Sequence, residues 1–255
     1  MYLTRFRVNT ARVGARKLLS SPQSLHAAVM GGFPGILPSA GGSPRVLWRL
    51  DRNARAEVLL YVVSPDKPDL THLVEDAGWP TLPEVGWETR DYMPFLDRLA
   101  VGDVWGFRLT ANPVHSVRVE GKEDKEKHDT KPTPHVTPRH QMRWLLQREE
   151  RSGFQVVRKA AEQERLPDGD DCELVVWGAQ RLRFRKTGSA ERAGGRGASD
   201  VRLTTVTFDG RLQVTDPAKL RHTLTAGLGR AKAYGCGLMT LAPVASAGAT
   251  QRRSA

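Results

Sequence analysis

The sequence predicts an α+β protein built from two copies of one architecture, and three observations support this prediction. The first half contains patterns for strand, helix, strand, strand, helix and strand, in that order. The second half repeats the order. Between them, residues 120–138 carry alternating charges, three prolines and almost no apolar side chain. The order is that of the ferredoxin-like fold, so we expect two such domains in tandem, joined by a flexible linker or exposed loop.

The first domain is expected to span residues 1–119. Residues 2–9 alternate in a pattern that predicts a strand with Thr4, Phe6 and Val8 on one face. A helix should follow in two pieces, RVGARKLLS and PQSLHAAVMGGF. The second piece is expected to begin after the capping residue Ser21, with Pro22 in its first turn.

The rest of this domain is predicted from shorter patterns. Residues 33–44 are rich in Gly, Pro and Ser, which is typical of a loop. RVLWRLD and AEVLLYVVS predict a hairpin. Residues 69–78 predict a short helix that ends at Gly78, and residues around 85–92 and 104–119 predict the remaining strands.

The second domain is expected over residues 139–243, with a frayed tail at 244–255. It should begin with the helix RHQMRWLLQREERSG, followed by the strands FQVVRKAAE and CELVVWGAQRLRFRK. VRLTTVTFDGRLQVTD predicts a hairpin with Asp209 and Gly210 at its turn. The helix PAKLRHTLTA is then expected to end at Gly227, and GLMTLAP predicts the last strand.

Charge is distributed unevenly along the chain. The formal net charge is +11 and the isoelectric point is about 10.1. Residues 1–138 carry a net charge of +2 and residues 139–255 a net charge of +9. A basic half predicts a polyanionic partner, most often a nucleic acid. A gene rich in arginine codons would give the same sign, since most of the cations are arginine.

Several classes of protein are disfavoured. The two cysteines, Cys172 and Cys236, lie far apart, which excludes a disulfide framework and gives no zinc-site spacing. No apolar stretch approaches the ~20 residues of a membrane span, and the N-terminus lacks the apolar segment of a signal peptide. We therefore expect a soluble, cytoplasmic protein with no membrane partner, no metal and no cofactor.

The stretch AGLGRAKAYGCGLMTLAP, residues 226–243, raises the question of phosphate binding. Its glycines and cations are Gly227, Gly229, Arg230, Lys232, Gly235 and Gly237. A dinucleotide-binding loop would follow a strand and precede a helix, whereas here a helix comes first, and the P-loop motif is also missing. A nucleotide-dependent enzyme is therefore disfavoured. A loop that lies against a nucleic-acid backbone and a simple helix cap with a sharp turn both remain open.

At this loop the sequence resembles a known family. GLGRAKAYGCGLMTLAP is similar to the C-terminal signature of the CasE family of CRISPR-associated repeat endoribonucleases, which belong to the type I-E Cascade complex. MYLTRFRVN, SPQSLHAAV, FRLTANPV and TFDGRLQVTDPAKL resemble the same family in order and spacing, so the resemblance runs from residue 1 to about 243. It implies two tandem ferredoxin-like, RRM-related domains. The implied partners are repeat-RNA stem-loops and other Cascade subunits.

The resemblance also implies an activity. Family members cut repeat RNA at the base of a hairpin without a metal, through attack by the ribose 2′-hydroxyl, and leave a 2′,3′-cyclic phosphate and a 5′-hydroxyl. His26 matches the family's catalytic histidine, and histidine suits proton transfer near neutral pH. Family members commonly carry tyrosine where this chain has Gln23, one helical turn before His26. An amide cannot exchange a proton as a phenol can, so a subunit that binds repeat RNA without efficient cleavage remains the alternative.

For RNA binding, the run QRLRFRK is the most informative. In a strand, Arg181, Arg183 and Arg185 would share one face and Lys186 would lie on the other. A solvated strand face remains the alternative. The resemblance implies that these arginines lie in a basic hairpin that holds the RNA stem. Arg158 and Lys159 are expected to extend the basic patch that the three arginines form.

Overall fold

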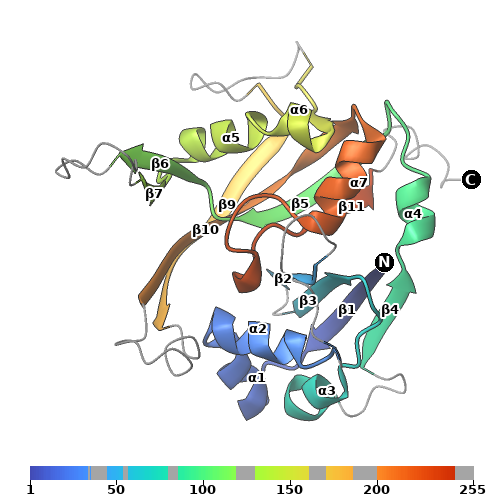
Figure 1. Ribbon diagram of the computed structural model, residues 1–255, viewed down its shortest axis with the longest axis vertical. Helices are drawn as coiled ribbons and strands as arrows, with labels where there is room; N and C mark the ends of the chain where they lie inside the picture. Colours follow the sequence, from blue (N-terminus) through green and yellow to red (C-terminus); the bar gives the residue numbers. More distant parts are fainter. Residues whose placement is uncertain are drawn as a thin grey trace, which may run out of the picture.

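The computed structural model describes residues 1–33, 35, 45–53, 57–79, 86–118, 130–160, 171–185 and 200–244. Two larger antiparallel sheets and one two-stranded ribbon organise these residues. Helices α1–α3 lie at one end of the molecule and α5 and α6 at the other, with the sheets between them (Figure 1).

The first sheet has the strand order β2-β3-β1-β4, and every neighbouring pair is antiparallel. Its elements in chain order are β1 (Tyr2–Val8), α1 (Val13–Leu19), α2 (Pro22–Met30), β2 (Leu47–Arg52), β3 (Val58–Ser64), α3 (Thr71–Ala77) and β4 (Trp87–Asp91). This is the predicted ferredoxin-like topology. The face of β1 that carries Thr4, Phe6 and Val8 is buried, as expected.

Helix α2 begins where the local sequence predicts, although it ends at Met30, before the expected Phe33. Ser21 caps α2 by accepting a hydrogen bond from the Gln23 N–H, and Pro22 occupies the first turn. Leu25 and Val29 of α2 are buried with Phe6 and Leu73 in the core between the sheet and the helices. The buried face of α2 therefore determines which of its side chains remain accessible.

The second sheet has the order β11-β5-β10-β8, and β9 also pairs with β10. Its strands are β5 (Val104–Ala111), β8 (Phe154–Val156), β9 (Leu174–Arg185), β10 (Asp200–Val214) and β11 (Met239–Pro243). The helices of this half are α5 (Pro138–Leu146), α6 (Glu149–Ser152) and α7 (Pro217–Ala226), and the short α4 (Met93–Asp97) precedes β5. This is again the ferredoxin-like order, with the second strand divided between β8 and β9.

One strand was expected in the wrong domain. The expected boundary at residue 119 assigned residues 104–119 to the first sheet, but β5 pairs with β10 and β11 of the second sheet. The chain therefore passes from the first sheet to the second between β4 and β5. The pairing partners of β5 come about one hundred residues later in the chain, and no local pattern encodes such a partner.

The hairpin expected at Asp209 and Gly210 is also wrong, because both residues lie inside the continuous strand β10. Gly210 pairs with Phe107 on β5 and Leu174 on β9. A Cβ atom at Gly210 would lie 2.4 Å from the carbonyl oxygen of Glu173. Gly210 allows neighbouring strands to approach closely, and it does not form a turn.

The segment expected as a linker is in part a strand. β7 (Thr130–Pro134) pairs with β6 (Val114–Arg118) in a two-stranded ribbon. Residues 120–129 of the expected linker lie outside the described residues, and residues 135–138 lead from β7 into α5. The strand expected over FQVVRKAAE is shorter, since β8 ends at Val156 and only an isolated bridge joins Arg158 to Cys172. Of the expected frayed tail, only Val244 is described.

The two sheets are joined by a buried arginine. Arg49 on β2 is 1% exposed and pairs with Asp51, at 2.7 Å and 2.9 Å. Its guanidinium also donates to the Arg108 carbonyl at 2.7 Å, the Leu238 carbonyl at 3.0 Å and the Thr240 hydroxyl at 2.8 Å, all in the second half. Arg49 therefore connects β2 with β5 and β11.

Candidate active site and nucleic-acid interface

His26 lies on α2, half-buried, one turn after Gln23. Residues three apart share a helix face, so these two side chains leave α2 on the same side. The buried neighbour Leu25 fixes the orientation of the helix against the first core. The local sequence thus determines where His26 leaves the helix, as predicted.

The His26 ring contacts a tryptophan that the sequence did not indicate. Nε1 of Trp48, on β2, donates a hydrogen bond of 3.4 Å to Nδ1 of His26. Burial lowers the pKa of His26 below its ordinary value of 6.5. Burial therefore favours the neutral form of His26.

The glycine-rich loop reaches α2 from the second half of the chain (Figure 1). Its short 3₁₀ helix, η2 (Lys232–Tyr234), packs against α2 and β2. Lys232 is half-buried, and burial together with the nearby Arg45 lowers its pKa. Arg230 is exposed. The loop thus brings Lys232 close to the helix that carries His26.

The four glycines of the loop have a structural reason to be glycine. Gly227, Gly229, Gly235 and Gly237 all have positive φ angles, from 77° to 90°. A Cβ atom at these positions would lie within 3.0 Å of a side chain or backbone atom of the protein itself. Gly235 and Gly237 are buried, so they have a packing role instead of the predicted direct contact with RNA. The helix-cap alternative therefore explains the glycines, while the cations between them remain accessible to a ligand.

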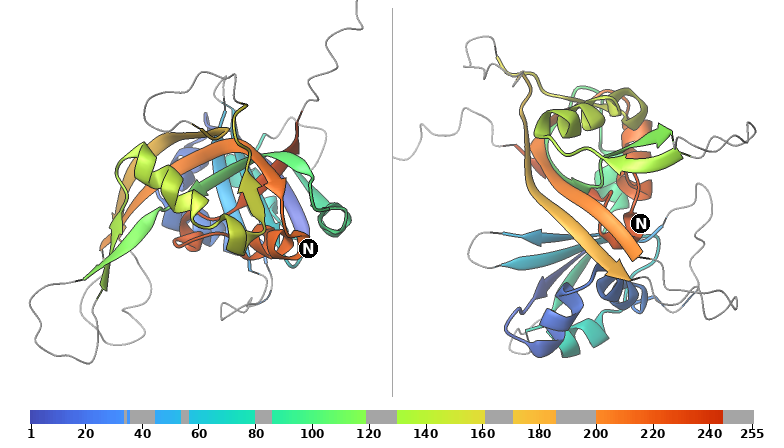
Figure 2. Two further views of the ribbon diagram at one scale, coloured as in Figure 1. Left: turned by 90° about the horizontal axis from the view of Figure 1, so that it is seen from above. Right: turned by 90° about the vertical axis from the view of Figure 1, so that its left-hand side faces the viewer.

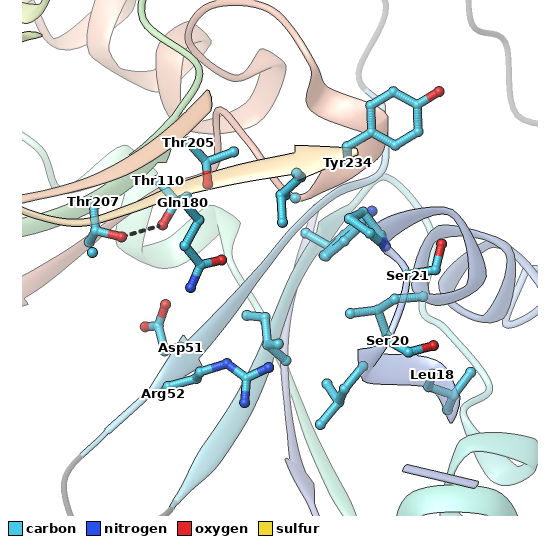
Figure 3. Close-up of a pocket in the computed structure, with 18 of the residues that line it drawn as sticks. Leu18, Ser20, Ser21, Asp51, Arg52, Thr110, Gln180, Thr205, Thr207 and Tyr234 are labelled. Atoms are coloured by element: carbon cyan, nitrogen blue, oxygen red, sulfur yellow. Dashed lines mark hydrogen bonds between the residues drawn. The ribbon is translucent and has the colours of Figure 1, made fainter. Parts of the chain in front are cut away.

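A small cavity of about 180 Å³ lies beside this loop, between the α1–α2 corner, β2 and the β9–β10 ribbon. Figure 3 shows Ser21 and Tyr234 on one side of it and Asp51, Gln180 and Thr207 on the other. Trp48 and Gly235 also line it. Trp48, which donates to His26, is thus part of the cavity wall.

A larger hollow of about 760 Å³ lies on the other side of Tyr234. It is bordered by β9, β10, the β6–β7 ribbon and the glycine-rich loop. Its cationic side chains are Lys131, Arg181, Arg183, Arg202 and Arg230. We call this hollow the basic groove. Figure 2 shows the long β9–β10 ribbon that forms one wall of it.

The predicted RNA-binding residues are only partly brought together. Arg181 and Arg183 are exposed on β9 and both line the basic groove, although Arg183 also pairs with Asp200 at 2.6 Å. Arg185 is the last residue of β9, and Lys186 lies outside the described residues. The structure therefore unites part of the arginine strand with Arg230 of the loop.

Arg158 and Lys159 lie apart from this groove in the described part of the chain. Arg158 follows β8 and forms an ion pair with Asp171. The Lys159 N–H donates to the Asp171 carbonyl at 3.0 Å. Neither residue is among those that border the basic groove or the cavity. The expectation that they extend one patch with Arg181 and Arg183 is not supported by these positions.

Sequence reasoning also missed a histidine stack. The rings of His115 and His135 are 4.6 Å apart, and those of His135 and His140 are 5.9 Å apart. Burial, and then the neighbouring His115 and His140, lower the pKa of His135. The stack arises because the β6–β7 ribbon lies beside α5, and residues 130–134, which form β7, were expected to be part of a linker.

None of the helices in the described part of the chain is long and apolar enough to cross a membrane. Within the same residues, no group of three or more His, Cys, Asp or Glu side chains could hold a metal ion.

Comparison with known proteins gives consistent matches. A family model described as CRISPR associated protein matches residues 1–243. The CRISPR-associated endoribonuclease Cse3 of Thermus thermophilus is 31% identical over 243 residues, which cover 95% of this chain and 100% of that protein. The Cascade subunit CasE of Escherichia coli is 27% identical over 204 residues, which cover 78% of this chain and 89% of that protein.

Solved structures are similar over the same range. Thermus thermophilus Cse3 bound to an RNA that represents a pre-cleavage complex superposes with a TM-score of 0.68 at 26% identity, covering 95% of this chain and 98% of that one. Cas6e from Escherichia coli superposes with a TM-score of 0.57 at 20% identity, covering 96% of this chain and 100% of that one, and supports the fold alone.

Proposed function

Because this chain belongs to the family of CRISPR-associated proteins that includes Cse3 and CasE, we propose that it is an endoribonuclease that cleaves CRISPR precursor RNA. The cut falls within the repeat, at the base of its stem-loop, and the protein retains the stem-loop product. The similarity to the endoribonuclease Cse3 over residues 1–243 supports the proposal.

One structural observation supports this proposal most strongly. His26, a half-buried neutral histidine, lies on the helix against which the cation-bearing loop packs, and that loop also borders the basic groove. An RNA stem held by Arg181, Arg183 and Arg230 would bring its phosphate backbone toward α2. In this proposal, the glycine-rich loop connects the helix that carries the catalytic group with the surface that binds the RNA stem.

The proposed reaction needs no metal. The 2′-oxygen forms a bond to the adjacent phosphorus, and the bond from phosphorus to the 5′-oxygen breaks. The 2′-hydroxyl loses a proton and the 5′-oxygen gains one, so the products are a 2′,3′-cyclic phosphate and a 5′-hydroxyl. His26 acts at the scissile phosphate, and Lys232 and Arg230 stabilise the negative charge that develops on it.

Gln23 enters this site as a hydrogen-bonding residue. Its amide can donate to the phosphate or to the attacking ribose, but it does not titrate. This feature favours the second candidate function, a subunit that binds repeat RNA and cleaves it inefficiently. Similarity to the Cascade subunit CasE supports the further proposal that the chain works with other Cascade subunits in either case.

The test is single-turnover cleavage of a cognate repeat hairpin in excess EDTA. Wild type should cut the RNA, and His26→Ala should abolish cutting while it leaves binding intact. A 2′-deoxy substitution at the cut site should block the reaction equally. His222→Ala is the matched control, since His222 is exposed on α7. Tight binding without cleavage by wild type would favour the binding subunit, and dependence on added metal would refute the mechanism.

A further inference from the structure

Trp48 lies between His26 and the glycine-rich loop. It is 3% exposed, and its indole N–H donates to Nδ1 of His26 at 3.4 Å. The six-membered part of the same ring packs on Gly235, where a Cβ atom would lie 2.6 Å from Cζ3 of Trp48. Gly235 also has a φ of 79°. The loop can therefore close over Trp48 only because residue 235 has no side chain.

The hydrogen bond restricts the protonation of His26. An indole N–H is only a donor, so Nδ1 of His26 must accept and must carry a lone pair. In the neutral imidazole the proton then resides on Nε2. In the imidazolium both nitrogens carry protons, and the indole would lose its acceptor. The contact therefore favours one tautomer of the neutral ring and opposes protonation.

We propose that Trp48 is a positioning residue that holds His26 neutral with its proton on Nε2, so that His26 meets the scissile phosphate as a hydrogen-bond donor. This inference rests on the proposed function for its catalytic meaning, but the tautomer itself does not depend on cleavage. A neutral imidazole that donates from Nε2 stabilises charge on the phosphoryl oxygens. It cannot use the same nitrogen to accept the 2′-hydroxyl proton.

Charged groups around α2 do not act against this assignment. The titratable side chains on the elements in contact with α2 are Arg16 and Lys17 on α1, Arg49, Asp51 and Arg52 on β2, His72, Glu75 and Asp76 on α3, and Lys232 and Tyr234 on η2. Cations outnumber carboxylates among them, and Asp51 is paired with Arg49. Burial lowers the pKa of His26, and the Trp48 contact acts in the same direction.

The experiment measures the ring nitrogens of His26 directly by NMR, on RNA-free protein labelled with ¹⁵N in histidine. The His26 signals are assigned by their loss in His26→Asn. In wild type, Nδ1 should show the shift of an unprotonated acceptor and Nε2 that of a protonated nitrogen. In Trp48→Phe, which keeps an aromatic ring, the two tautomers should mix and the pKa of His26 should rise.

Trp144→Phe is the matched control. Trp144 is equally buried, at 3% exposure, and its Nε1 has no hydrogen-bond partner among the described residues. This variant should leave the His26 nitrogen signals unchanged. Gly235→Ala is a second probe, because a Cβ there would displace the Trp48 ring, and it should shift the same signals.

Cleavage assays connect the tautomer with function. Trp48→Phe should lower the single-turnover rate by about tenfold and leave RNA affinity unchanged. If the wild-type protein does not cut RNA, the proposed function is refuted. The NMR measurement on the same protein still determines the tautomer of His26. A proton on Nδ1 in wild type, or unchanged His26 signals in a folded Trp48→Phe protein, would overturn the inference whatever the cleavage result.

Discussion

The buried Arg49 offers the sharpest test of how the two halves are held together. Replacing Arg49 with Met would remove five hydrogen bonds, two to Asp51 and three to groups of the second half. Asp51 is only 7% exposed, so its carboxylate would stay buried. Its nearest remaining cation is Arg108, whose Nη1 lies 3.7 Å away.

The expected cost follows from the charge that is left behind. Removing one partner of a buried ion pair typically costs about 3–5 kcal/mol, because the other charge remains desolvated. We expect the free energy of unfolding of Arg49→Met to fall by about this amount. With a urea dependence of about 3 kcal/mol per molar, the denaturation midpoint would fall by roughly 1–1.7 M.

The assay is urea denaturation, followed by tryptophan fluorescence and circular dichroism. Arg90→Met is the matched control, because Arg90 pairs with Glu88 at the surface with its side chain 79% exposed, and such pairs contribute at most about 1 kcal/mol. The double variant Arg49→Met with Asp51→Leu should recover much of the loss, since it buries no unpaired charge. A loss in Arg49→Met no larger than that in Arg90→Met would refute this reasoning.

Three further predictions concern the loop, the groove and His26. Gly227→Ala should lower the free energy of unfolding by at least about 1 kcal/mol more than Gly102→Ala in the same denaturation assay. Both glycines have a positive φ, but only at Gly227 would a Cβ meet a side chain, 2.9 Å from Leu47. Arg230→Ala should weaken binding of the repeat hairpin and reduce the slope of log affinity against log salt by about 0.7–0.9, whereas an unchanged slope would remove Arg230 from the phosphate contacts. Because burial lowers the pKa of His26 below 6.5, the neutral form persists in the folded protein to lower pH than in the unfolded chain. The NMR signals of the His26 ring nitrogens should therefore titrate with a midpoint below pH 6.5, and a midpoint above that value would contradict the neutral state assigned to His26.

Features that depend on a few neighbouring residues were predicted well. Ser21 and Pro22 begin α2, and Gly153 ends α6 in the left-handed conformation with a φ of 77°. Asp216 caps α7 by accepting from the Lys219 N–H. Such caps and periodicities depend on interactions within about one turn or one strand, so the local sequence encodes them.

Features that depend on distant pairing were predicted poorly. Asp209 and Gly210 have the composition of a turn, yet β10 runs through them between β5 and β9. Asp209 instead binds Arg108 on β5 with two contacts of 2.7 Å. The preference of two residues for a turn contributes less stability than the backbone hydrogen bonds and ion pairs that a continuous strand makes with its neighbours on both sides.

The sequence by itself thus determined the ferredoxin-like order of both halves, the caps of α2, α6 and α7, the basic second half and the helix that carries His26. Only the tertiary structure decided the partners of that histidine, which are Trp48 on β2 and the loop around Gly235 from the far end of the chain. The same holds for the basic groove, since Arg181 and Arg230 come from separate elements. Periodicity reports which face of an element is buried, but the identity of the groups packed against that face depends on how the whole chain closes around its cores.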